Sequence, residues 1–183
     1  MPKPIPILAL LSLLLACALT AFSNSTTPFP IDPEKPFHLE FGRGSGWHGL
    51  SVVILDESGQ TILSREGSTF RDGVIYQDWS TTEITLPHDL IREIASAVNA
   101  NAIITLNKSY SGHVYDGTQW VFLIAQGNNQ KAVYFDNKFP SAITRFAKSL
   151  DEILARGGLP KADWKSGGRA LDQTLWKSIA PPK

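Results

Sequence analysis

The sequence predicts an α+β domain, in which an antiparallel sheet of about four to six strands carries two main helices on one face and a short C-terminal helix. Two observations lead to this expectation: apolar residues alternate with polar ones in several short runs, and two longer segments repeat apolar residues at intervals of three and four. The chain of 183 residues, 43% of them hydrophobic, is long enough for one domain with its own core.

The first 24 residues have the features of an export signal. Lys3 gives a positive start, residues 5–15 are mostly apolar, and small residues follow. The apolar run is shorter than the ~20 residues that span a bilayer. We therefore expect residues 1–24 to be a signal peptide and the mature protein to lie outside the cytoplasm, in the periplasm, in the cell envelope or secreted.

Cys17 is a candidate lipidation site. Residues 14–17 read Leu-Leu-Ala-Cys and resemble the lipobox of bacterial lipoproteins, whose cysteine is acylated, although Leu15 is larger than the usual residue there. The alternative is cleavage after Ala21 or Ser23, with no lipid. In either case the Pro/Thr-rich residues 25–36 are expected to form an extended tether that joins no core.

A single domain is expected over residues 37–183. Phe37, Leu39 and Phe41 alternate with less apolar residues, which is typical of a strand with one buried face. Residues 50–55 and 60–65 flank a turn and predict a hairpin. Strand is also expected over residues 66–86, where polar residues interrupt the pattern.

The first helix is expected from residue 87 to about residues 99–101, because Leu90, Ile94 and Val98 recur on one face. Residues 102–106 fit either a frayed continuation of this helix or a short strand.

A second hairpin is expected over residues 120–135, followed by a helix that begins after Pro140 and ends at Gly157. A short terminal helix is expected where Leu171, Leu175 and Ile179 repeat every fourth residue.

These elements together resemble a known group of domains. Tyr110, an Asp116-Gly117 pair that leads into a hairpin, and an amphipathic helix before Trp164 are similar to uncharacterised α+β domains of bacterial secreted proteins and lipoproteins. The resemblance covers roughly residues 37–164. It implies a fold and an extracytoplasmic location, and because that group has no assigned activity it implies no catalytic residue.

Composition excludes several function classes. Lysine and arginine together balance aspartate and glutamate at 17 each, so nucleic-acid binding is not expected. Residues 44–49 match G-x-G-x-x-G, but a strand follows them where a dinucleotide site needs a helix. The backbone amides of this loop, with Arg43 and His48, could instead hold a small anion.

No catalytic constellation can be assigned. The four histidines lack metal-binding spacing, no nucleophile motif is present, and no metal or cofactor is expected. A hydrolase site could still assemble in space from His48, His113 and Asp116. This stays open as an alternative.

The many aromatic residues are the remaining signal: most of them are expected to serve the core, and the others could form a binding surface. Alternation along residues 131–135 puts Val133 and Phe135 on one face and Tyr134 on the other, and a sheet face left uncovered by helices would present Tyr134 to a ligand. Trp47 is a further candidate. The sequence thus favours an exported, non-catalytic binding or interaction module for an unknown protein or small ligand, with membrane contact only through a lipid at Cys17. The second alternative is an inhibitor of an extracytoplasmic enzyme that acts through a protruding loop at residues 45–48.

Overall fold

The structure is a computed structural model that describes residues 28–45, 49–112 and 117–166. The expected signal peptide, Cys17 and the terminal helix lie outside these residues. In the part that is described, no helix is both long enough and apolar enough to cross a membrane.

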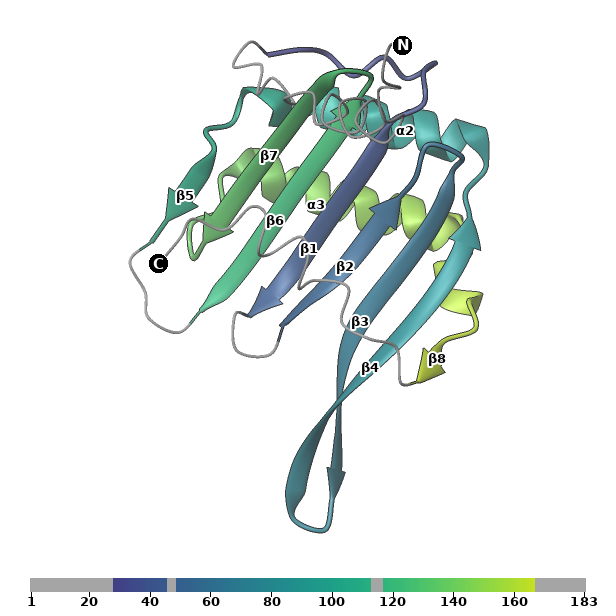
Figure 1. Ribbon diagram of the computed structural model, residues 1–183, viewed down its shortest axis with the longest axis vertical. Helices are drawn as coiled ribbons and strands as arrows, with labels where there is room; N and C mark the ends of the chain where they lie inside the picture. Colours follow the sequence, from purple (N-terminus) through teal and green to yellow (C-terminus); the bar gives the residue numbers. More distant parts are fainter. Residues whose placement is uncertain (1–27, 46–48, 113–116, 167–183) are drawn as a thin grey trace, which may run out of the picture.

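Eight strands form one sheet, in the order β5-β7-β6-β1-β2-β3-β4-β8 (Figure 1). Their bounds are β1 (His38–Ser45), β2 (Gly49–Leu55), β3 (Gln60–Arg71), β4 (Val74–Thr85), β5 (Ser109–Ser111), β6 (Thr118–Gln126), β7 (Asn129–Asp136) and β8 (Lys165–Ser166). All neighbours are antiparallel except β5 and β7, which are parallel. The α+β class is confirmed. The expected four to six strands in a wholly antiparallel sheet is wrong, because the two short edge strands were not anticipated.

The β3–β4 hairpin is longer than the sheet that carries it. The two strands pair without interruption from Gln60 with Thr85 to Arg71 with Val74, whereas β2 pairs only with residues 61–64 of β3. Asp72 and Gly73 form the turn with φ of 50° and 79°, the left-handed values that a tight hairpin needs. The distal half therefore projects beyond the sheet as a two-stranded arm (Figure 1).

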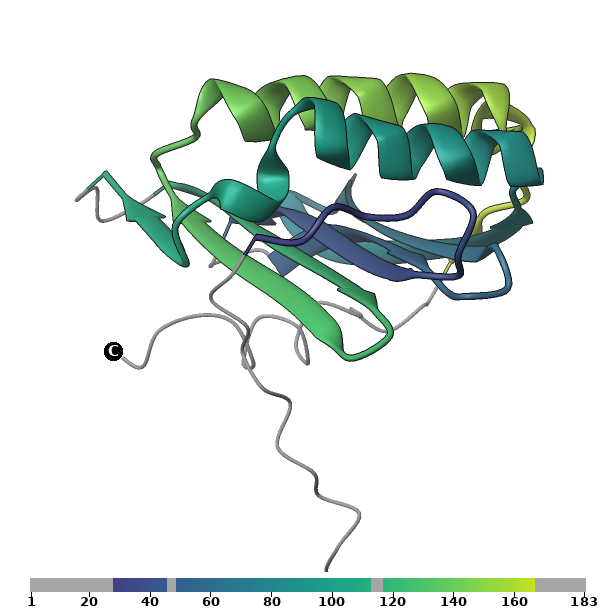
Figure 2. The same ribbon diagram turned by 90° about the horizontal axis from the view of Figure 1, so that it is seen from above.

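Helices α2 (His88–Ala100) and α3 (Ser141–Arg156) lie side by side on one face of the sheet, as expected (Figure 2). Each follows a proline, and each buries one apolar stripe against the strands. Residues 102–106 are neither frayed α-helix nor strand. Ala102 takes a left-handed φ of 51°, which ends α2, and the 3-10 helix η1 (Ile103–Thr105) follows.

Aromatic rings fill the space between α3 and strands β1, β6 and β7. We call this set the aromatic cluster. Phe146 of α3 meets Phe41 and Phe122 edge to face, with ring centroids 5.6 and 5.5 Å apart. The cluster consists of Phe41, Trp120, Phe122, Phe135, Phe139 and Phe146. Edge-to-face pairs stabilise a core beyond their buried area.

The segment before β1 takes part in this packing. Ile31 is 1% exposed and belongs to the core. The Asn99 side chain donates a hydrogen bond to the Ile31 carbonyl at 2.7 Å and accepts one from its N–H at 2.9 Å. Gln126 contacts the backbone of Asp32 in the same two ways. The expectation that residues 25–36 join no core is therefore wrong for Ile31, because two side-chain amides hold this backbone in place.

Candidate binding site

Most residues singled out from the sequence lie outside the described ranges. Trp47, His48, His113 and Asp116 are among them. The assembled hydrolase site and the protruding inhibitory loop therefore stay predictions. Arg43 and Tyr134 are described, and they lie on opposite faces of the sheet.

Tyr134 points away from the helices, as the alternation along β7 predicts. It pairs with Val121 and packs in a small aliphatic cluster with Leu50 and Val52. The tyrosine is only 8% exposed, and burial, followed by the charge of Asp136, raises the pKa of its phenol. Its ring is therefore part of a packed cluster and offers little surface to a ligand.

Arg43 points toward the helices. Its guanidinium donates two hydrogen bonds to the Asp151 carboxylate of α3, at 2.8 and 2.6 Å, and lies 5.2 Å from the centroid of the Phe41 ring. Such a two-bond arginine–carboxylate pair fixes geometry as well as charge. The pair links the end of β1 to α3 and forms one wall of a pocket.

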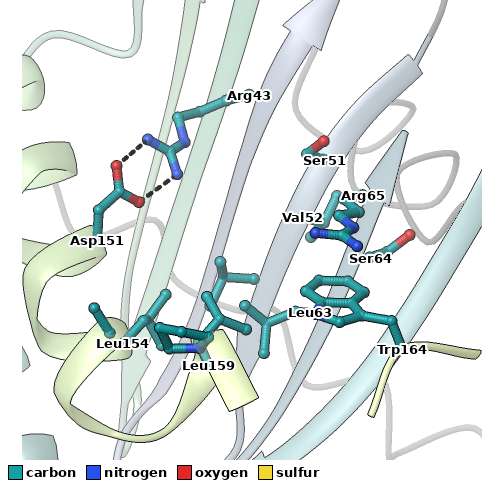
Figure 3. Close-up of a pocket in the computed structure, with 13 residues that line it drawn as sticks. Arg43, Ser51, Val52, Leu63, Ser64, Arg65, Asp151, Leu154, Leu159 and Trp164 are labelled. Atoms are coloured by element: carbon teal, nitrogen blue, oxygen red, sulfur yellow. Dashed lines mark hydrogen bonds and ion pairs between the residues drawn. The ribbon is translucent and has the colours of Figure 1, made fainter. Parts of the chain in front are cut away.

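This pocket is a cavity of about 470 Å³ on the helix-covered side of the sheet, between α3, the 3-10 helix η2 (Leu159–Lys161) and strands β1–β3 (Figure 3). Its size falls within the range of small-molecule sites. The walls are largely aliphatic and aromatic, with a few polar groups. The residues that line it include Ser51, Leu63, Arg65, Leu154, Leu159 and Trp164.

Arg65 and Trp164 form the second polar feature of the pocket. The guanidinium carbon of Arg65 lies 3.9 Å from the centre of the Trp164 ring, a close cation–π contact. The loop that carries Trp164 is fixed to β4, because the Thr82 hydroxyl donates a hydrogen bond to the Asp163 carbonyl at 2.8 Å. On its other side, β8 pairs with Ser80 and Thr81 of β4. Trp164 therefore gives Arg65 a fixed platform.

Ser51 adds a hydroxyl to the same wall. Its oxygen accepts a hydrogen bond from the Glu66 N–H at 3.3 Å. Within the described chain the hydroxyl hydrogen has no acceptor, so it remains available to a ligand.

The titratable groups of the lining are two arginines and one carboxylate. The lining holds no histidine or cysteine, and its one carboxylate, Asp151, is engaged with Arg43. Across the described ranges, no group of three or more histidine, cysteine, aspartate or glutamate side chains is placed to hold a metal ion. The pocket lining thus combines positive charge, two serine residues, Ser51 and Ser64, and apolar surface.

Sequence inspection identified Arg43 as a binding candidate but missed Arg65, and it used Trp164 only as a landmark of the resemblance to other domains. No local motif joins the two, because they meet through the fold. A scan against protein-family models returned no match, and a search of curated proteins found no similar sequence.

Proposed function

We propose that this protein is a non-catalytic binding module that works outside the cytoplasm, and that its ligand site is the pocket beneath α3. The observation that carries the proposal is a cavity of about 470 Å³ with apolar walls beside a stacked Arg65–Trp164 pair. Cavities of this size, with few polar groups in apolar walls, are typical of small-molecule sites.

The location rests on the sequence. The export signal in residues 1–24 supports an extracytoplasmic protein, and acylation of Cys17 would anchor it to a membrane. A measured mass of the mature protein distinguishes acylated Cys17 from cleavage after Ala21 or Ser23.

The pocket can be tested with N-phenyl-1-naphthylamine, an uncharged fluorescent probe whose emission rises in apolar surroundings. We expect saturable binding to the unmodified protein. Leu63→Trp replaces an aliphatic side chain with a larger aromatic one that fills part of the cavity. We expect the probe to bind this variant at least about tenfold more weakly, a loss of ~1.4 kcal/mol of binding free energy. Leu159→Trp, at the η2 side of the pocket, is a second filling variant in case Leu63→Trp disturbs the core.

Ile62→Trp is the matched control. Ile62 is next to Leu63 on β3 but points to the other face of the sheet, where it is 37% exposed. This variant should bind the probe like the unmodified protein. If the unmodified protein does not bind the probe, or if both filling variants bind it as well as Ile62→Trp does, the pocket is not the ligand site.

A further inference from the structure

Resting on this proposed function, we infer the class of ligand: an apolar monocarboxylate, whose hydrocarbon body lies against Leu63, Leu154 and Leu159 and whose carboxylate is bound by Arg65. The inference follows from the charge, the donor geometry and the size of the pocket.

Charge is the first step. The lining contains two arginines, Arg43 and Arg65, and one carboxylate, Asp151, so the site has a net positive charge of one. Asp151 already neutralises Arg43 through two hydrogen bonds. Over the part of the chain that is described, Arg65 forms no ion pair with a carboxylate. A ligand with one negative charge would give Arg65 the partner that Arg43 already has.

Donor geometry is the second step. The contact between Arg65 and Trp164 occupies one face of the guanidinium and leaves its N–H edge available. Such an edge matches the two oxygens of a carboxylate. The Ser51 hydroxyl adds another donor to the lining. Because Trp164 is held in place by Thr82 and β8, the guanidinium loses less freedom when the ligand binds.

Size and polarity are the third step. Since one water, with its single non-hydrogen atom, occupies ~30 Å³ of liquid, a cavity of about 470 Å³ has room for a ligand of on the order of 15 non-hydrogen atoms, which suits both a ten-carbon chain and the naphthylamine probe. The side chains of Leu63, Leu154 and Leu159 suit a hydrocarbon body. A straight-chain carboxylate such as decanoate fits both the size of the cavity and the apolar character of its walls.

The experiment compares decanoate with 1-decanol, which has the same chain and no charge. Each compound competes with N-phenyl-1-naphthylamine for the unmodified protein and for Arg65→Gln. We expect decanoate to bind at least about tenfold more weakly to Arg65→Gln, because the substitution removes the charged hydrogen-bond donors that face the carboxylate. The affinity for 1-decanol should stay within about twofold, a free-energy difference well below the ~1.4 kcal/mol of a tenfold change.

Arg145→Gln is the matched control, because Arg145 is an exposed arginine of α3 that hydrogen-bonds Asn101 and is not part of the pocket lining. It should leave the decanoate affinity unchanged. If the probe binds but decanoate and 1-decanol compete equally well, or if Arg65→Gln weakens neither, the anionic ligand class is wrong while the binding site stands. If the probe itself does not bind, the proposed function fails first and the ligand class with it.

Discussion

The layer between α3 and the sheet is packed in two different ways on the two sides of β1. Over β6 and β7 the inward side chains are large rings, among them Trp120, Phe122 and Phe135, and they fill the space. Over β2 and β3 the inward side chains include Ser51 and Leu63, which are too small to fill it, and a pocket remains. One half of the contact surface of α3 is therefore closely packed against the sheet, while the other half borders a pocket.

The strongest test of this comparison is Phe146→Ala. Phe146 is fully buried at the centre of the aromatic cluster, and deletion of such a ring costs ~3–5 kcal/mol of the free energy of unfolding. Leu159→Ala, in the pocket wall, removes a side chain that is already partly exposed, and its cost should be less than half as large. Denaturant unfolding of both variants measures the difference. Equal costs would mean that the two halves anchor α3 alike.

A smaller effect is expected where the N-terminal segment joins the core. Asn99→Ala removes both hydrogen bonds to the Ile31 backbone and leaves its N–H and carbonyl without these partners, which should cost ~1–3 kcal/mol. Ser96→Ala, on the exposed side of the same helix, is the control and should change stability by less than ~0.5 kcal/mol. If Asn99→Ala has no larger effect than Ser96→Ala, the segment contributes nothing to stability.

The smallest effect concerns a titrating pair on β1, the strand between the two halves. His38 lies 2.7 Å from Glu40, and this hydrogen bond raises the pKa of the imidazole above its usual 6.5, although burial opposes the shift. Because the folded pKa is the higher one, the pair stabilises the fold fully below about pH 6.5, and the contribution is lost as the pH rises through the folded pKa. The effect is small because the two side chains remain 31% and 23% exposed.

Thermal unfolding between pH 5 and pH 9 measures this contribution, and His38→Gln should remove that part of the pH dependence. Probe binding to the pocket should not change over the same range in which the pair titrates, since neither residue lines it. An unaltered pH profile for His38→Gln would show that another group is responsible.

The sequence allowed the larger elements to be predicted because each contains enough residues to show a period. Leu90, Ile94 and Val98 predicted α2, and all three are buried in one stripe. The short edge strands β5 and β8 could not be foreseen, since three and two residues show no period. The turn between β3 and β4 could have been predicted from the sequence, because Asp72-Gly73 is a typical hairpin pair.

The pocket was beyond sequence reasoning for a different reason. A cavity is set by the distance between α3 and the sheet and by the sizes of side chains that meet from separate elements. Arg65 belongs to a strand and Trp164 to a loop near the other end of the domain, and no spacing rule connects them. Their contact depends on the pairing of β8 with β4 and on the hydrogen bond from Thr82 to Asp163, and the sequence predicted neither of these.

The short strands at both margins of the sheet have a consequence for how molecules of this protein meet one another. The unpaired N–H and C=O groups of an exposed edge strand can hydrogen-bond to a strand of a second copy, and many aggregates begin with such pairing. Here the outer rows of β7 and β4 are interrupted partway by β5 and β8, so neither offers a ladder as long as the strand itself. The arm beyond the sheet is strongly twisted (Figure 1), and a twisted ribbon is a poor template for flat pairing. Over the described residues, the margins of the sheet thus offer a second copy only short stretches of unpaired backbone.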